Sequence, residues 1–319
     1  MSMSLTPFLD LRHIEKSFRV RGKQLRAVRD VSLSIREGES LGLVGESGSG
    51  KSTLGRCAIG LTAPDAGSVR LLGEELVGRS RRDLRPIWRQ MQMVFQDAGA
   101  ALHPRMTVGR NVIDPLVARR LVSRREGWEI ARQLLEQVGL HADQAEAFPF
   151  ELSGGQQQRV MIARALAVEP KLLICDEAVS ALDVSVQAQM MDLFIRLKQE
   201  RNLSYLFISH NLPTVGQIAD RIAVMYLGQI VEVGTTQRMF QKPYHPYSKA
   251  LFASVLPIPA NVSARRELRA LPGEMPSPFD LPRGCPFHTR CPVAVDRCRD
   301  VRPQLRAIDV DHQVACHLA

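Results

Sequence analysis

A glycine-rich stretch of nine residues, 45–53, ends in a lysine and two hydroxyl residues and matches the pattern G-x-x-x-x-G-K-[ST]. Its glycines allow tight, partly left-handed turns that aim backbone N–H groups at a phosphate. Lys51 adds a positive charge for the β- and γ-phosphates of a nucleotide, and the Ser52 hydroxyl is suited to ligate Mg²⁺. We therefore predict a phosphate-binding loop made of Gly45, Glu46, Ser47, Gly48, Ser49, Gly50, Lys51, Ser52 and Thr53.

The residues on either side favour a phosphate loop over a chance match. Residues 40–44 form a short apolar run that predicts a strand leading into the loop, and residues 53–61 predict a helix after it. The positive end of that helix would face the bound phosphates.

Four polar residues follow three predicted strands and suit phosphate chemistry. Asp176 can hold Mg²⁺, and Gln96 can ligate Mg²⁺ or the attacking water. Glu177 can orient and deprotonate that water, and His210 can hydrogen-bond the γ-phosphate. Each residue alone would be an ordinary polar strand end or loop residue. Their joint order beside the phosphate loop predicts the role, because open α/β sheets bind ligands at the carboxyl ends of their strands.

A second phosphate-facing element is predicted at Leu-Ser-Gly-Gly-Gln, residues 152–156. Ser153 can cap the helix that follows, and Gly154 and Gly155 leave space for a phosphate at its positive end. The alternative is a plain helix start. Since the chain already has one complete triphosphate loop, this element makes most sense if it serves the nucleotide of another subunit.

The pattern of apolar residues predicts an α/β fold. Residues 8–36 alternate in the manner of half-exposed antiparallel strands, and the pattern becomes helical from about residue 106 to 165. Continuous apolar runs at 172–175 and 205–208, separated by a helix at 186–201, predict a parallel sheet covered on both faces. Two strands are expected around Gly228, and beyond Pro243 proline is frequent and periodicity is weak.

The formal net charge of +9 includes short arginine clusters that would suit nucleic acid or anionic lipid. Only 5% of the residues are aromatic and none is interleaved with those clusters, so we read the clusters as solvated faces and expect no nucleic-acid partner. No apolar run approaches the roughly 20 residues that span a bilayer. Residues 1–7 lack the features of a signal peptide, which predicts a cytosolic protein. The clusters are Arg79, Arg81, Arg82; Arg119, Arg120; Arg124, Arg125; and Arg265, Arg266.

The six cysteines fall into two groups. Cys57 and Cys175 lie in predicted core elements and are expected to be buried apolar residues. The other four crowd into the last 35 residues, where a reducing compartment favours a metal site over disulfides. These four are Cys285, Cys291, Cys298 and Cys316.

Together these motifs resemble those of the ATP-binding cassette (ABC) ATPases over about residues 8–240. The correspondences are Walker A at 45–52, Q-loop Gln96, the signature at 152–156, Walker B at 172–176 with Glu177, a D-loop at 180–183 ending in Asp183, and switch His210. Phe18 falls where that family has its adenine-stacking aromatic; a core residue at a strand end is the alternative. The resemblance implies two subunits that close head to tail over two ATP molecules. Lys51, Ser52, Gln96 and Asp176 of one would then face Ser153 and Gly155 of the other.

The C-terminal part resembles the oligopeptide/dipeptide/nickel importer branch at residues 245–251, 271–278 and 284–292. This implies an ABC ATPase domain at 1–240 with a P-loop NTPase core, an N-terminal antiparallel β subdomain and an α-helical subdomain at about 97–160, followed by an extension at 241–319. It further implies a peripheral subunit on the cytoplasmic face of the inner membrane that powers import of peptides or related solutes. The implied partners are two permeases, a second paralogous ATPase in a heterodimer rather than a homodimer, and indirectly a solute-binding protein.

In that branch the four cysteines resemble ligands of a [4Fe–4S] cluster. Four thiolates suit iron–sulfur and zinc equally, but the spacing lacks the C-x-x-C pairs of many zinc ribbons, which favours iron–sulfur. A reduced tail without metal is the third alternative.

Three positions depart from the family pattern. Ala178 replaces the usual proline, Asn211 the common aspartate and His103 the common asparagine, yet none is a reacting group, so we predict an active ATPase. The alternatives are a nickel or other solute importer subunit, a soluble ABC protein of DNA repair or the ribosome, and a partner that binds ATP without hydrolysing it. The soluble class usually has long insertions or two cassettes, and neither is present here.

Overall fold

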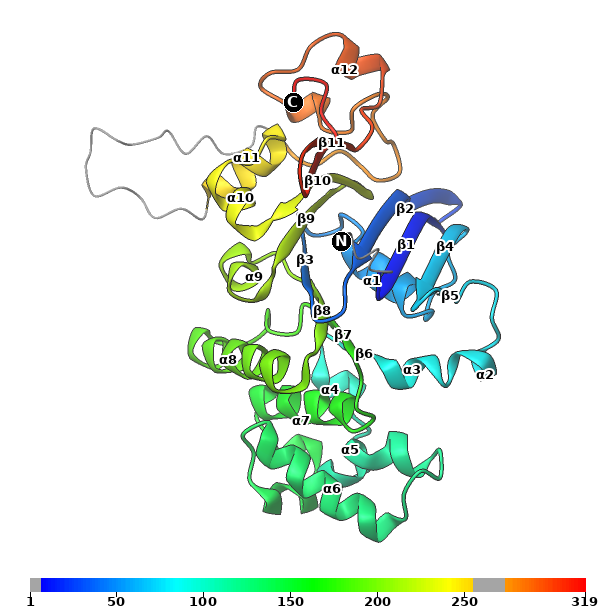
Figure 1. Cartoon of the computed structure of the whole chain (residues 1–319), viewed down its shortest axis with the longest axis vertical. Coiled ribbons are helices and arrows are strands. Elements are labelled where there is room, and N and C mark those ends of the chain that lie inside the picture. Colours follow the sequence, from blue (N-terminus) through cyan, green and yellow to red (C-terminus); the bar gives the residue numbers. More distant parts are fainter. Residues whose placement is uncertain (1–6, 255–272) are drawn as a thin grey trace, which may run out of the picture. The chain divides into compact units, whose positions relative to one another are not determined.

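The structure is a computed structural model, and it describes residues 7–254 and 273–319 (Figure 1). The chain divides into two units. Unit 1 comprises Ile35–Glu39 and Gly78–Ile208, and unit 2 comprises Pro7–Ser34, Ser40–Val77 and Ser209–Ala319. Three segments named in the sequence analysis lie outside the described residues: the arginine pair Arg265 and Arg266, residues 271–272 of the predicted importer motif, and residues 1–6.

Unit 1 contains the predicted parallel strands. They are β6 (Met91–Val94), β7 (Leu172–Asp176) and β8 (Ser204–Ile208), with β7 in the middle. β7 is parallel to both neighbours, with Leu172 opposite Met91 and Ser204. Every residue of β7 and β8 is buried, which explains why their sequences show no polar alternation. Helix α8 (Val184–Arg201) follows β7 and precedes β8, as expected.

Along the chain, most helices of unit 1 lie between β6 and β7. Helices α5 (Val108–Val117), α6 (Arg124–Gln137) and α7 (Gly154–Leu166) pack against one another (Figure 1). Helix α6 begins at Arg124, because Ser123 and Glu126 form a reciprocal capping box at its start. The shorter helices are α2 (Arg81–Leu84), α3 (Ile87–Gln90), α4 (Ala98–Ala101), η1 (Ala142–Glu146) and η2 (Pro149–Glu151).

Unit 2 contains the antiparallel β subdomain predicted for the N-terminal part. Strands β1 (Leu9–Val20), β2 (Lys23–Ile35), β4 (Ala66–Leu71) and β5 (Glu74–Glu75) lie in the order β2-β1-β4-β5. β1 pairs antiparallel with β4, with Leu9 opposite Leu71. Alternate apolar residues of β1 and β4 are buried, as the alternating sequence predicts.

A second group of strands in unit 2 follows the order β3-β9-β10-β12-β11. These are β3 (Ser40–Val44), β9 (Arg221–Tyr226), β10 (Gln229–Thr235), β12 (His312–Val314) and β11 (Arg306–Asp309). β3 and β9 are parallel, and the remaining pairs are antiparallel. β12 thus adds residues from the end of the chain to β10.

The helices of unit 2 are short. They are α1 (Lys51–Ala58), α9 (Leu212–Ile218), α10 (Thr236–Gln241), α11 (Pro246–Ala253), η4 (His288–Arg290) and α12 (Arg297–Asp300). Helix α1 starts two residues before the predicted Thr53, because the Leu54 N–H already donates to Gly50. It also ends before the predicted Leu61, since left-handed Gly60 stops it.

The fold is therefore of the predicted α/β class, with parallel strands, an antiparallel β subdomain and a helical part. The division at residue 240 stays a prediction. Among the helices that the structure describes, none has the length and apolar character needed to cross a bilayer.

Candidate functional site

The loop between β3 and α1 has the backbone shape that its glycines predict. Gly45, Gly48 and Gly50 have φ of 151°, 78° and 106°. A Cβ on Gly45 would lie 2.1 Å from the Met225 carbonyl oxygen, and one on Gly50 would lie 2.1 Å from that of Ala27. Glycine is therefore required at both positions, and the backbone around them is left bare for a phosphate.

Lys51 is buried and its ammonium closes this loop. Its Nζ donates to the carbonyl oxygens of Gly45 at 2.8 Å and Glu46 at 2.9 Å. The buried Ser49 hydroxyl lies 3.5 Å away. The first turn of α1 places Ser52 and Thr53 next to Lys51. The loop thus gathers one cation, hydroxyl groups and a helix start, and these residues fit a nucleotide phosphate with Mg²⁺.

Glu46 has partners that lie far away in the sequence. Its N–H donates to the Tyr247 hydroxyl at 2.9 Å, and its carboxylate accepts from Arg290 Nη1 at 3.0 and 3.1 Å. Glu46 is part of the predicted loop, whereas no sequence pattern identifies Tyr247 and Arg290 as contacts of that loop. No local signal could identify them, although both lie within the segments that resemble the importer branch.

The other predicted residues of unit 2 are Phe18 and His210. Phe18 is 38% exposed on β1, with Lys16 Nζ 5.6 Å from its ring centre. That exposure leaves a face of the ring open to a planar base. His210 is exposed. The residue before it, Ser209, donates its N–H to the Leu43 carbonyl oxygen of β3, and the side chain of the next residue, Asn211, caps α9.

In unit 1, Asp176 and Glu177 lie at the carboxyl end of β7. Asp176 is buried as the last residue of the strand. Glu177 has φ of 50°, and its N–H donates to Ile208 at 3.0 Å. The Ser180 hydroxyl donates to the Glu177 carbonyl at 2.9 Å and closes the turn that follows. A left-handed non-glycine residue at a strand end is a strained conformation that is enriched at functional sites.

Gln96 is exposed just beyond β6, and α7 contacts the same segment. The buried Gln158 of α7 donates from Nε2 to the carbonyl oxygen of Phe95 at 3.3 Å. Asp97 caps the short helix α4 that follows. A hydrogen bond therefore connects the segment around Gln96 to α7, the helix that Ser153 caps.

Ser153 is the N-cap of α7, as predicted. Its hydroxyl accepts from the Gln156 N–H at 3.3 Å, and the Gln156 side chain accepts from the Ser153 N–H at 2.9 Å. Ser153 and Gly154 are exposed, and nothing lies within 4 Å of a Cβ built on Gly154. The second glycine has a packing reason, because a Cβ on Gly155 would lie 2.7 Å from Val186 Cγ1.

Asp183 caps α8 in this structure. Its carboxylate accepts from the Val186 N–H at 3.0 Å and from the Ser185 hydroxyl at 2.7 Å. These two hydrogen bonds lower the pKa of Asp183, so it is ionised at the positive end of α8. The predicted site residues thus fall into two sets. The phosphate loop, Phe18 and His210 belong to unit 2, and the others belong to unit 1.

The four C-terminal cysteines do not form the expected metal site in this structure. Within the described residues, no three Cys, His, Asp or Glu side chains make a group that could hold a metal ion. The thiols are nevertheless neighbours. Burial raises the pKa of Cys285 to about 11, and the other three thiols add to that rise. The chemistry of four neighbouring thiols suits a cluster, but their arrangement here does not present one.

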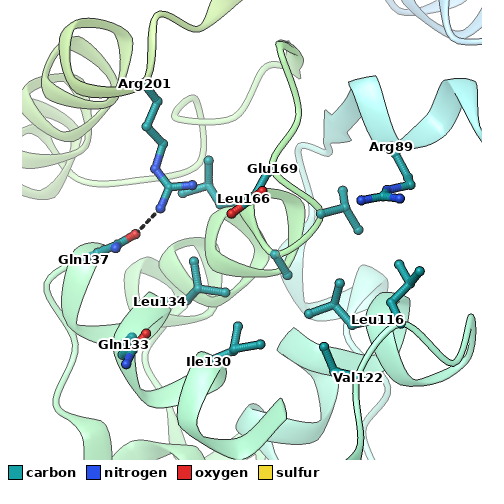
Figure 2. Close-up of a pocket in the computed structure, with 13 residues that line it drawn as sticks. Arg89, Leu116, Val122, Ile130, Gln133, Leu134, Gln137, Leu166, Glu169 and Arg201 are labelled. Atoms are coloured by element: carbon teal, nitrogen blue, oxygen red, sulfur yellow. Dashed lines mark hydrogen bonds between the residues drawn. The ribbon is translucent and has the colours of Figure 1, made fainter. Parts of the chain in front are cut away.

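The described part of unit 1 contains cavities among its helices. Figure 2 shows one of about 420 Å³, with Leu116, Ile130 and Leu134 among its apolar lining and Arg89 and Arg201 at its sides. The Arg201 guanidinium donates to Gln137. None of the predicted nucleotide residues lines this cavity. A second, of about 350 Å³, is lined by Leu102, His103 and Arg164 and others of the helical part.

Two family models match the chain. Residues 28–180 match the ABC transporter model, and residues 231–298 match the oligopeptide/dipeptide transporter C-terminal region. A probable peptide ABC transporter ATP-binding protein, y4tS of Sinorhizobium fredii, is 48% identical over 94% of this chain and 85% of its own length. A putative oligopeptide transport ATP-binding protein, YkfD of Bacillus subtilis, is 45% identical over 99% and 97%.

Solved structures agree with this. A dimeric post-hydrolysis state of the ATP-binding cassette MJ0796, bound to ADP and Pi, superposes with a TM-score of 0.66 and 30% identity. It covers 72% of this chain and 98% of the other. Both curated relatives named above are described as peptide or oligopeptide transport proteins. The comparisons give no support to the soluble alternative.

Proposed function

The chain belongs to the ABC transporter ATP-binding proteins whose C-terminal region is of the oligopeptide/dipeptide type, and on that basis we propose that it hydrolyses ATP to power import of peptides or related small solutes. The observation that carries the proposal is the phosphate loop. Gly45 and Gly50 leave the loop backbone bare, and the buried ammonium of Lys51 donates to the Gly45 carbonyl oxygen. This arrangement suits the binding of a triphosphate.

Individual roles follow from residue chemistry. The loop residues 45–53 bind the phosphates, and Phe18 stacks on the base. Ser52, Gln96 and Asp176 would hold Mg²⁺, which would neutralise charge on the phosphate oxygens. Glu177 accepts the proton of the attacking water, and His210 donates to the γ-phosphate.

The exposed start of α7 and Asp183 are assigned to the nucleotide of a second subunit. Support comes from Ser153 and Gly154, which are exposed at the positive end of a 13-residue helix. The second subunit is proposed to be a paralogous ATPase, giving a heterodimer.

The remaining partners are two permeases and, on the other side of the membrane, a solute-binding protein. The protein would then lie at the cytoplasmic face of the inner membrane. The 350 Å³ cavity, which is lined by Ala100, His103, Asn111 and Arg164 among others, belongs to the helical part that follows Gln96 in the chain, and it supports a permease contact. We assign it to a cytoplasmic segment of a permease.

The four cysteines are proposed to bind a [4Fe–4S] cluster, supported by the ligand chemistry of four thiolates and opposed by the arrangement described above. Anaerobic purification followed by iron, sulfide and zinc analysis decides between the alternatives. Brown protein with about four irons per chain supports the cluster. Colourless protein with one zinc, or with no metal, rules it out.

The experiment that tests the function is purification of tagged Glu177→Gln protein with ATP from gently solubilised membranes, followed by identification of its partners. We expect two multi-span permeases and a second cassette ATPase. The wild-type assembly in lipid should hydrolyse ATP faster when the loaded binding protein is added. Recovery of ribosomes or DNA-repair proteins, or of no membrane protein, would contradict the proposal.

A further inference from the structure

One of the contacts between the C-terminal extension and the phosphate loop is an ion pair. Arg290 Nη1 lies 3.0 Å from Glu46 Oε2, across 244 positions of sequence. The Arg290 side chain is 8% exposed and that of Glu46 is 28% exposed. Because the pair is partly shielded from water, the Coulomb attraction between its two charges is stronger than in a surface ion pair.

Glu46 is held at all of its polar groups. Its N–H donates to Tyr247 and its carbonyl accepts from Lys51 at 2.9 Å in both cases, while Arg290 binds its carboxylate. Two of these three partners belong to the extension. The backbone of the loop at Glu46 is therefore positioned by residues outside the loop itself.

Arg290 packs against a cluster of aromatic rings, one from β9 and two from the extension. The rings of Tyr226, Tyr247 and Phe287 lie 4.7 to 5.5 Å apart, and all three are buried. The Arg290 guanidinium lies 5.9 Å from the Tyr226 ring centre, and Nη1 also donates to the Tyr226 hydroxyl at 3.4 Å. Burial acts to lower the pKa of Arg290, but its hydrogen bonds to Glu46 and Tyr226 outweigh this and raise it.

Arg290 lies next to the cysteines. It ends the turn η4, between Cys285 and Cys291, and the His288 N–H of that turn donates to Cys285 at 3.1 Å. The Cys285 N–H in turn donates to Cys298 at 2.9 Å. The position of the guanidinium thus depends on the fold of the cysteine segment.

The charge of Glu46 is unfavourable where it lies. A carboxylate in the loop would repel the triphosphate, since like charges at a partly buried site repel far more strongly than in water. Arg290 neutralises this carboxylate and holds it on the side of the extension.

We propose that Arg290 is a positioning residue for ATP binding: through Glu46 it sets the charge and shape of the phosphate loop, so that the affinity for ATP depends on the folded cysteine-containing extension. This inference rests on the proposed function of the loop. It adds that a change in the cysteine segment would act on the nucleotide through the pair of Arg290 and Glu46.

The test is a set of four full-length proteins: wild type, Arg290→Gln, Glu46→Gln and the double variant. Equilibrium binding of Mg-ATP is measured at low salt. Arg290→Gln should weaken ATP binding about tenfold, because it leaves the carboxylate unneutralised. Glu46→Gln should bind Mg-ATP more tightly than the wild type, because it leaves the positive charge of Arg290 unpaired beside the loop. The double variant should return to within about twofold of the wild type, since no net charge remains.

A purely structural pair would give a different pattern. Both single variants would then weaken binding, and the double variant would be no better. That result, or an unchanged affinity in Arg290→Gln, overturns the inference. Arg297→Gln, an exposed arginine of the same extension, is the matched control and should bind as the wild type does.

Two further measurements complete the test. In the assembled transporter Arg290→Gln should raise the KM for ATP with little change in kcat, and the effect should shrink as salt rises. If Arg290→Gln does not fold, Arg290→Lys replaces it, and a loss of more than about tenfold despite the retained charge would refute the charge argument. If the wild type itself binds no ATP, the proposed function fails; if only the variants behave otherwise than expected, this inference alone fails.

Discussion

The carboxylate of Glu232 and the imidazole of His312 form a hydrogen-bonded pair, with Nε2 2.8 Å from Oε1 and neither side chain exposed to solvent. Glu232 belongs to β10 and His312 to β12, 80 positions later. The same carboxylate accepts from the N–H groups of Tyr244 at 2.7 Å and His245 at 2.9 Å. One buried residue therefore fixes both the start of α11 and the strand near the chain end.

Glu232→Gln should lower the stability of the folded protein by about 1–3 kcal/mol. The amide keeps the size of the side chain but has one acceptor oxygen, so whichever way it turns, its NH₂ group faces the N–H of Tyr244 or His245. Chemical denaturation measures the free energy of unfolding. Glu129→Gln, on an exposed face of α6, is the control and should change it by less than about 0.5 kcal/mol. Equal stability of the two variants would contradict the assigned role of Glu232.

Most of the strands and long helices could be predicted because their signals are local. The buried runs of β7 and β8 and the alternation of β1 are read within a few residues. Helices α10 and α11 were not predicted, since they have only six and eight residues and lie among prolines. The pairing of β12 with β10 depends on Glu232 and His312 meeting in space, and periodicity contains no information about that.

In the candidate site, too, the parts with local signals could be predicted. The phosphate loop and the capped start of α7 are patterns of consecutive residues, and the structure has the expected backbone conformation at both. The contact of Arg290 with the loop could not be predicted, because its partner Glu46 lies 244 positions away in the sequence. The metal expectation rests on the count and spacing of the cysteines and on the resemblance to the importer branch, and none of these specifies how the thiols are arranged around a common centre.

Gly50→Ala should abolish tight ATP binding. Both Gly50 and Gly73 have positive φ, but a Cβ on Gly50 would meet the Ala27 carbonyl oxygen at 2.1 Å, whereas nothing lies within 4 Å of one on Gly73. Gly73→Ala is therefore the matched control for backbone strain. Displacing the loop should weaken ATP binding by about 100-fold in Gly50→Ala, and Gly73→Ala should stay within about twofold. Similar affinities in the two variants would contradict the importance of the close approach of Gly50 to Ala27.

Glu177→Gln should keep ATP binding and lose turnover. The substitution removes the proposed base and leaves the phosphate loop unchanged, so single-turnover hydrolysis should slow by about 100-fold or more. ATP should then hold the ATPase pair closed, which size-exclusion chromatography with light scattering can detect. Glu136→Gln, exposed on α6, should hydrolyse at the wild-type rate. Turnover of Glu177→Gln at the wild-type rate would remove Glu177 from the base role.

Ser153→Ala separates capping from a role in ATP hydrolysis, because the chain contains a matched cap. Ser153 and Ser123 each form a reciprocal capping box, with Gln156 on α7 and with Glu126 on α6. Removing either hydroxyl should cost about 1 kcal/mol of stability, measured by chemical denaturation. If Ser153 also binds the nucleotide of the partner ATPase, its loss should slow hydrolysis by the assembled transporter at least about tenfold, since hydrogen bonds to charged groups are strong. Ser123→Ala should leave the rate unchanged. Equal effects of the two variants on hydrolysis would reduce Ser153 to a helix cap and leave the second phosphate-facing element without support.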